Sequence, residues 1–201
     1  MNNNKSNEQN NYEYDCGSLV FDTKDIITNA INYATDKHSG QFRKGTKKPY
    51  IIHPFEVMQI LTEEGCTKEV RAAGILHDVL EDTEATKDEI LKYFGEEVLK
   101  LVSSETEDKS KSWKERKQTT IDELDNASTD VKMICFADKL SNLRSMATDQ
   151  KEFGEILWNR FNAPKKEIEW YYRSIFFKMN DLSKTKMHKE YFELLDEVFG
   201  G

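Results

Sequence analysis

Apolar residues recur at intervals of three and four along most of the chain, which is the periodicity of amphipathic α-helices. The first stripe comprises Ile26, Ile27, Ala30, Ile31 and Ala34. Comparable stripes predict further helices over residues 53–65, 67–79, 86–95, 96–104, 113–126, 129–146, 164–178 and 185–199. No alternating apolar run bounded by turn residues, which would indicate β-strands, is visible. The pattern therefore predicts an all-α helical bundle of roughly eight to ten helices.

Polar and special residues mark where several of these helices begin and end. Pro54 stands near the start of the second predicted helix and Gly65 at its end, the asymmetry typical of helices. Thr67 can cap the third helix. Thr86 followed by Glu89 three residues later is a capping-box pattern. These signals support the helix boundaries that the periodicity indicates.

Length and composition predict one globular domain. Residues 1–20 are polar and Asn-rich, and we expect a disordered tail there. Residues 21–201 carry the helical pattern without a linker that would divide them.

No run approaches the roughly 18 apolar residues of a membrane helix. The three cysteines form no CxxC pair, so neither a disulfide framework nor a thiolate zinc site is indicated, and we expect a cytoplasmic protein.

The net charge of −8 argues against a general nucleic-acid binder, because such proteins need a cationic face. One local cationic cluster nevertheless stands out, namely Arg43, Lys44, Lys47 and Lys48. Such a cluster can bind an anionic small molecule even when the whole chain is acidic. We therefore expect a small-molecule partner and neither a nucleic acid nor a membrane.

Two histidines and two aspartates are candidate metal ligands. His77 and Asp78 are adjacent within a helical stretch, about 100° apart around its axis, so both can reach one ion. His53 precedes a proline at a helix start. Asp138 lies among apolar neighbours, where an unpaired carboxylate would be very costly. A lone buried histidine is more often a hydrogen-bonded core residue, but four such groups form a ligand set with coordination positions open to water and substrate.

Two further carboxylates, Glu81 and Asp82, follow one turn after His77 and Asp78 on the same predicted helix. They stand near its C-terminus, where the macrodipole disfavours negative charge. We interpret them as a general acid/base pair beside the metal. The alternative is a solvated acidic helix end.

Three segments together resemble a known enzyme family. They are YATDKHSGQFRKGTKKPYIIHPFEV, AAGILHDVLEDT and FADKLSNLRSM. The hydrolase domain of the RelA/SpoT alarmone enzymes has the pattern H-x-G-Q-x-R, PY-x-x-HP, LHDV-x-EDT and AD-x-x-x-N-x-R in the same order. The match covers residues 25–146 as a motif-bearing core and leaves residues 147–201 as a helical extension, which looks like the tail of stand-alone HD hydrolases.

The resemblance implies a helical HD fold that holds one divalent ion, usually Mn²⁺. It implies hydrolysis of the 3′-pyrophosphate of guanosine tetra- or pentaphosphate to GDP or GTP and pyrophosphate, a reaction of the stringent response. The metal ligands it implies are His53, His77, Asp78 and Asp138. By the same resemblance Glu81 and Asp82 activate and orient water, Arg43 and Lys44 lie at the nucleotide, and Asn142 contacts the ribose and phosphate region. His38 also matches, with loop packing as its alternative role.

The sequence departs from the family pattern at several positions. The basic loop is one residue longer and carries two extra lysines, Lys47 and Lys48, which we include among the substrate-binding residues. Cys135 stands where lysine is common and Ser141 where histidine is common. Other interpretations stay open: hydrolysis of an adenosine alarmone, NADPH or a nucleoside monophosphate, or a catalytically silent nucleotide-binding module. Aromatic residues in the C-terminal third are compatible with a homo-oligomer.

Overall fold

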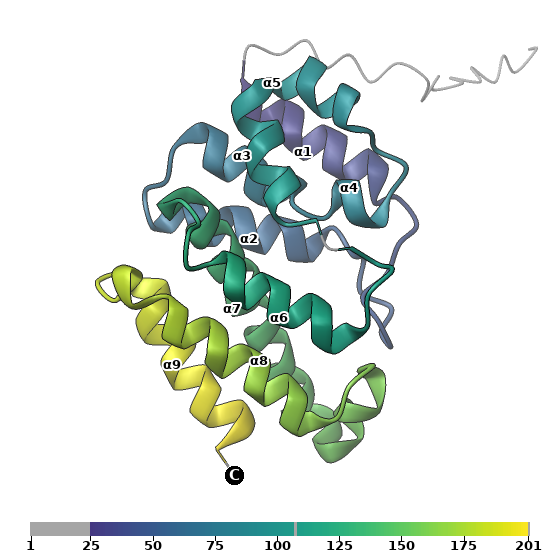
Figure 1. Ribbon diagram of the computed structural model, residues 1–201. Coiled ribbons are helices and arrows are strands. Elements are labelled where there is room, and N and C mark those ends of the chain that lie inside the picture. Colours follow the sequence, from purple (N-terminus) through teal and green to yellow (C-terminus); the bar gives the residue numbers. More distant parts are fainter. Residues whose placement is uncertain (1–24, 107, 201) are drawn as a thin grey trace, which may run out of the picture.

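The computed structural model describes residues 25–106 and 108–200, and these residues fold into nine α-helices and two short 3₁₀-helices. Within these ranges no strand forms, and the all-α prediction is confirmed (Figure 1). The predicted tail over residues 1–20 lies outside the described residues. The helices are α1 Ile26–Lys37, α2 Ile52–Glu63, α3 Lys68–Leu76, α4 Val79–Asp82, α5 Lys87–Ser104, α6 Trp113–Glu123, α7 Thr129–Phe153, η1 Gly154–Arg160, α8 Lys165–Lys178, η2 Asn180–Leu182 and α9 Lys186–Phe199.

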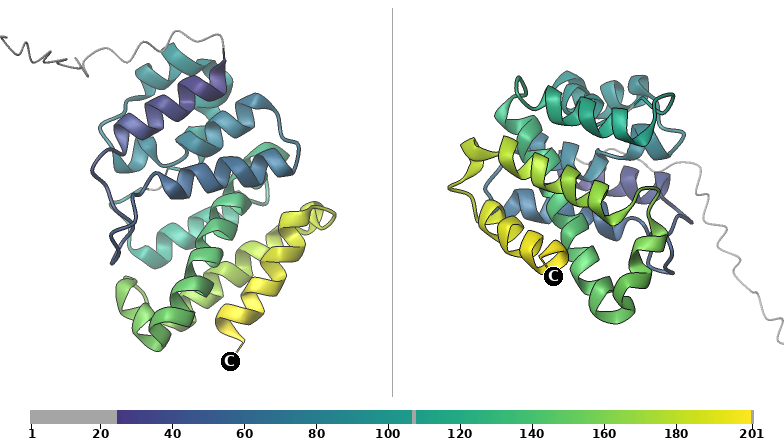
Figure 2. Two further views of the ribbon diagram at one scale, coloured as in Figure 1. Left: turned by 180° about the vertical axis from the view of Figure 1, so that it is seen from behind. Right: turned by 60° about the horizontal axis from the view of Figure 1, so that its bottom comes forward.

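Helix α7 is the centre of the bundle. It packs against α2 and α3 on one side and against η1 and α9 on the other. Figures 1 and 2 show α1, α3 and α5 gathered at one end of the molecule and α8 and α9 at the opposite end. Twelve side chains of α7 are buried, including Ile134, Leu140 and Leu143. This helix therefore supplies core residues to both ends of the bundle. No helix in the described ranges has the length and apolar character needed to cross a bilayer.

The predicted helix starts are confirmed by their hydrogen bonds. The Thr67 hydroxyl accepts from the Val70 amide at 3.3 Å. Thr86 and Glu89 form both bonds of a capping box, which satisfies two amides that the first turn leaves free. Gly95 adopts φ 85° inside α5, so the two helices expected over residues 86–104 form one helix with a break at this glycine.

The third predicted helix was placed wrongly at its end. It stops at Leu76, the residues His77 and Asp78 form a turn, and the separate helix α4 begins at Val79. Apolar spacing continued through Val79, which is why the break was invisible in the pattern. The helix expected over residues 129–146 is also longer, because α7 continues to Phe153 before η1 begins.

Gly74 allows α3 to pack directly on α2. A Cβ atom at this position would lie 2.3 Å from Leu61 Cδ1, and Leu61 is fully buried. The Gly74→Ala substitution should therefore destabilise the fold by about 1–2 kcal/mol, because overpacking outweighs the gain of about 1 kcal/mol in helix propensity. Urea denaturation measures the change.

The control is the same substitution in a Leu61→Ala background, where the clashing methyl is gone. There Gly74→Ala should be neutral or stabilising, although Leu61→Ala itself lowers stability by about 2–5 kcal/mol. An equal loss in both backgrounds would contradict direct packing as the cause.

Candidate metal centre

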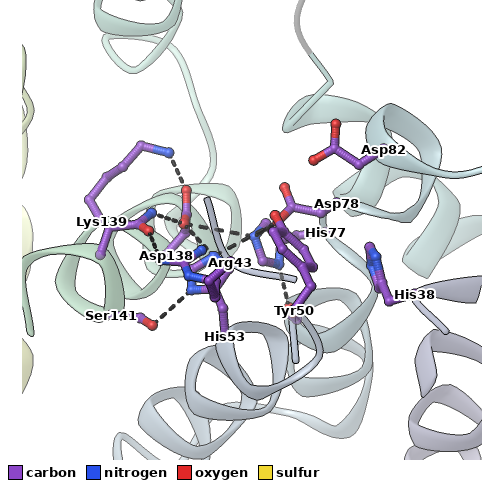
Figure 3. A network of polar contacts seen from close by, with 12 residues as sticks. His38, Arg43, Tyr50, His53, His77, Asp78, Asp82, Asp138, Lys139 and Ser141 are labelled. Atoms are coloured by element: carbon purple, nitrogen blue, oxygen red, sulfur yellow. Dashed lines mark hydrogen bonds and ion pairs between the residues drawn. The ribbon is translucent and has the colours of Figure 1, made fainter. Parts of the chain in front are cut away.

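Three helical elements bring nitrogen and oxygen donors together at one point. His53 comes from the start of α2, His77 from the residue after α3, and Asp138 from the middle of α7. All three are buried, and their ligand atoms lie within 4.8 Å of one another. The distance from His53 Nε2 to Asp138 Oδ1 is 3.0 Å, and that from His77 Nε2 to the same oxygen is 3.8 Å (Figure 3). This group could hold a metal ion.

Asp78 joins this group through its Oδ2 atom. That oxygen lies 3.0 Å from His77 Nε2 and 3.8 Å from His53 Nε2. The Tyr50 hydroxyl donates to it at 2.5 Å. The structure therefore brings together all four residues that the sequence proposed, although three separate segments supply them.

Hydrogen bonds on the far side of each ring orient the two imidazoles. His77 Nδ1 lies 2.8 Å from the Gly74 carbonyl oxygen, which can only accept, so Nδ1 carries the proton. His77 Nε2 is buried and makes no hydrogen bond to any described residue. His53 Nδ1 lies 2.8 Å from Ser141 Oγ, and that hydroxyl donates to Glu56 Oε2 at 2.8 Å, so His53 also presents Nε2. Both Nε2 atoms thus face carboxylate oxygens and, once deprotonated, complete a donor set that fits a divalent transition metal.

The electrostatics of the centre favour positive charge between its donors. Burial lowers the pKa of His53, which favours the neutral, ligating imidazole. Burial would also lower the pKa of His77, yet the carboxylates of Asp78 and Asp138 raise it to about 9. Burial alone would raise the pKa of Asp138, but Lys139 and both histidines hold it well below its usual range. The carboxylates thus attract a cation strongly, and a divalent ion satisfies them directly.

Glu81 and Asp82 line the same cavity, whose volume is about 210 Å³. Their predicted position at the end of the long helix is wrong, because they belong to α4, whose N-cap is Asp78. The macrodipole argument for them therefore does not apply. Lys109 compensates their charge: its Nζ lies 3.1 Å from Asp82 Oδ1 and donates to the Glu81 carbonyl at 2.7 Å.

Several polar residues of the centre were missed by sequence reasoning. Lys139 is partly buried, forms an ion pair with Asp138, and follows it directly in the chain, which could have flagged it. Glu105 lines the cavity, and burial raises its pKa to about 7. Tyr50 stands three residues before His53 of the HP motif and positions Asp78. No sequence feature near Glu105 marks it as a site residue, because only the tertiary structure brings the end of α5 to the cavity.

The basic loop folds as a small hairpin that leads into α2. The Arg43 amide donates to the Lys48 carbonyl at 2.9 Å, and the Arg43 guanidinium donates to Asn142 Oδ1 at 2.7 Å. Asn142 in turn donates to Asp138 Oδ1 at 2.7 Å, which ties the loop to the metal centre. Lys44 donates to Asn162 at 2.7 Å.

Predicted residues outside the metal centre differ in their positions. Arg43, Lys44 and Lys48 line an adjoining cavity of about 310 Å³, which shares Arg43, Tyr50 and Asn142 with the metal cavity. Lys47 is exposed and lines neither of these two cavities. His38 is buried, stacks near the Tyr50 ring at 4.9 Å and bonds Gln41, so its contacts are those of loop packing.

Comparison with known proteins gives consistent matches. The profile of a family described as "HD domain" matches residues 30–157. The guanosine-3′,5′-bis(diphosphate) 3′-pyrophosphohydrolase MESH1 of Xenopus tropicalis is 40% identical over 124 residues, 60% of this chain and 69% of that protein. A solved structure of a metazoan orthologue of SpoT that hydrolyses ppGpp superposes with a TM-score of 0.71 at 29% identity, covering 87% of this chain and 96% of its own.

A second solved structure, of a Listeria monocytogenes EGD-e protein, has a TM-score of 0.69 and 37% identity. It covers 74% of this chain and 99% of its own. Both structural matches extend over more of the chain than residues 25–146 could supply. The helical extension is therefore included, at least in part, in the shared fold.

Ser141 offers a test of how the histidine at the start of α2 is held. Ser141→Ala removes the acceptor of the His53 Nδ1 proton and leaves that buried donor unsatisfied. We expect affinity for Mn²⁺ to fall about 10- to 100-fold, the usual effect of losing an outer partner of a ligating histidine. Calorimetric titration of the metal-depleted protein measures it. Ser145→Ala on the same helix is the matched control, and an equal loss in both variants would contradict this role.

Proposed function

The chain belongs to the HD domain family, and from this premise we propose that it removes the 3′-pyrophosphate of guanosine tetra- or pentaphosphate in a metal-dependent reaction. The observation that carries the proposal is the joining of a His/Asp donor cluster to an acidic pair on one side and a basic loop on the other. MESH1 relatives carry the name of this activity at about 40% identity. The products are GDP or GTP and pyrophosphate.

We assign His53, His77, Asp78 and Asp138 as ligands of one divalent ion; two imidazoles and two carboxylates suit several ions, and the family resemblance favours Mn²⁺ among them. When bound, the ion would supply a water of lowered pKa and polarise the attacked phosphoryl group. The orientation of both imidazoles supports the assignment, because Nε2 of each faces the carboxylates. Tyr50 holds Asp78 in place by donating to Oδ2.

The remaining residues divide the work around this centre. Glu81 and Asp82 accept the proton of the attacking water or orient it, since both face the metal cavity. Arg43, Lys44 and Lys48 offset the charge of several phosphates. Asn142 lies between Arg43 and Asp138 and can contact the ribose and phosphate region. Lys47 adds positive charge to the loop from outside the cavities.

Turnover of a substrate panel tests the proposal. With Mn²⁺ present, kcat/KM for guanosine 3′,5′-bisdiphosphate should exceed that for GMP, GDP and NADPH, because a site with several cations suits two separate phosphate groups. Chelation of the metal should abolish turnover. Should GMP or NADPH be the better substrate, the alarmone assignment is wrong and another HD phosphohydrolase activity replaces it. Absence of turnover with every compound would indicate a silent nucleotide-binding module.

The acidic pair should be required for chemistry but not for metal binding. Glu81→Gln and Asp82→Asn keep the side-chain shape and remove the negative charge. We expect kcat to fall about 100-fold or more, the scale of general acid/base catalysis. Metal content, measured on the same preparations, should stay near wild type. Full activity in both variants would show that the two carboxylates have no catalytic role and are only a solvated acidic end of α4.

Arg43 and Lys48, which line the adjoining cavity, should matter more for activity than Lys47, which does not. Arg43→Lys should reduce kcat/KM more than Lys48→Gln does, because lysine cannot reproduce a bidentate contact with phosphate. Lys48→Gln should raise KM in a salt-sensitive way with little change in kcat. Lys47→Gln is the matched control, with a smaller effect. The proposed roles would be contradicted if Lys47 proved more important than Arg43.

A further inference from the structure

The adjoining cavity has walls suited to a flat aromatic ring. On the side of the metal centre it is bounded by Arg43, Tyr50 and Asn142. Five apolar and aromatic side chains, of Trp113, Met146, Leu157, Phe161 and Tyr172, face polar ones from the basic loop, α7 and the residues around η1. A cavity that combines aromatic walls with polar groups is typical of a small-molecule site, in which the polar groups set specificity.

Asp149 is a buried carboxylate in the wall of this cavity. The residue is 9% exposed, and its Oδ2 accepts from Arg160 Nη1 at 2.8 Å. Its other oxygen, Oδ1, is buried and has no hydrogen-bond partner among residues 25–106 and 108–200. A buried carboxylate oxygen without such a partner is costly, so this atom calls for an explanation.

Lys48 lies beside the unbonded oxygen, with its Nζ 3.6 Å from Oδ1. The Lys48 side chain is 57% exposed, so this ion pair is screened by solvent and contributes little. It can open when a ligand enters, which frees Oδ1 to accept hydrogen bonds and frees Lys48 to meet a phosphate. The hydrogen bond from Arg160 uses only Oδ2, so a structural role for Asp149 does not require Oδ1.

The position of Asp149 is fixed before any ligand binds. Its partner Arg160 lies over the Phe153 ring, with Cζ 4.4 Å from the centroid. On the other side Gly45 of the basic loop packs so closely that a Cβ atom there would lie 2.8 Å from Arg160 Cδ. A carboxylate held in this way loses little freedom on binding, which favours selective recognition.

Helix α7 sets the distance between the metal centre and Asp149. Asp138, Asn142 and Asp149 follow one another at intervals of four and seven residues, so they share one face of the helix. The rise per residue separates Asp138 from Asp149 by about 16 Å. This span suits a nucleoside whose 3′-phosphates lie at the metal and whose base lies against Asp149, with Asn142 at the ribose between them.

We propose that Asp149 recognises the guanine base of the substrate and thereby selects guanosine over adenosine compounds, an inference that rests on the proposed function for the placing of the nucleotide. Guanine presents two adjacent donors, N1–H and the 2-amino group, and a carboxylate can accept from both. Adenine presents a lone pair at N1 and no 2-amino group, so Oδ1 would face an acceptor. The buried oxygen thus gains partners from one base and repulsion from the other.

Binding of GDP, IDP and ADP in the presence of Mn²⁺ tests this proposal without turnover, because none of them carries a 3′-pyrophosphate. Calorimetry on the wild-type chain should give an affinity for GDP at least tenfold above that for ADP, with IDP between them because it lacks only the 2-amino group. Asp149→Asn should lower the GDP affinity about tenfold or more and leave the ADP affinity within about twofold. The GDP preference should therefore largely disappear.

Glu155→Gln is the matched control, because it removes the charge of an exposed carboxylate on η1 that lines neither cavity. It should leave the ratio of GDP to ADP affinity unchanged, and thermal unfolding of each variant reports on the fold. The proposal is overturned if the wild-type chain binds GDP and ADP equally, or if Asp149→Asn weakens both alike. If the GDP preference depends on Asp149 while alarmone turnover is absent, base recognition stands and the proposed function fails.

Discussion

The centre of this molecule depends on buried negative charge that needs a cation. Each imidazole Nε2 lies 3.0 to 3.8 Å from oxygens of the two carboxylates. Because the Nδ1 atoms of His53 and His77 bond to outer partners, both Nε2 atoms face these oxygens, and the carboxylates raise the pKa of His77 to about 9. A divalent ion would take the place of the proton on His77 Nε2 and satisfy the carboxylates by coordination. Such an ion would therefore stabilise the fold as well as serve the chemistry.

The polar network that supports this centre extends well beyond the ligands. From His53 it passes through Ser141 to Glu56, and Glu56 also accepts from Arg144 at 3.0 Å. Arg144 makes two bonds of 2.7 Å to Glu190 on α9, so the C-terminal helix reaches the metal centre through a chain of charges. The positions of the candidate metal-ligating side chains thus depend in part on α9, which contributes no such side chain itself.

Helix α7 connects the functional parts by placing them on one face. Asp138 belongs to the metal centre, Asn142 joins that centre to the basic loop, and Asp149 borders the adjoining cavity. A straight helix keeps such residues at fixed separations, because each residue adds a constant rise. The spacing of polar residues along α7 can therefore match the length of a bound nucleotide.

The sequence by itself determined the helical class and several helix caps, and it singled out the four residues of the candidate metal centre. Periodicity and capping are local, so Thr67, Thr86 and Glu89 could be assigned from neighbours a few residues away. The motifs around His53 and Asp138 identified donors without showing how they meet. The tertiary structure alone decided the break after Leu76, the approach of Glu105 and the burial of Asp149. These features depend on contacts between residues far apart in the chain, and such contacts leave no periodic trace in the sequence.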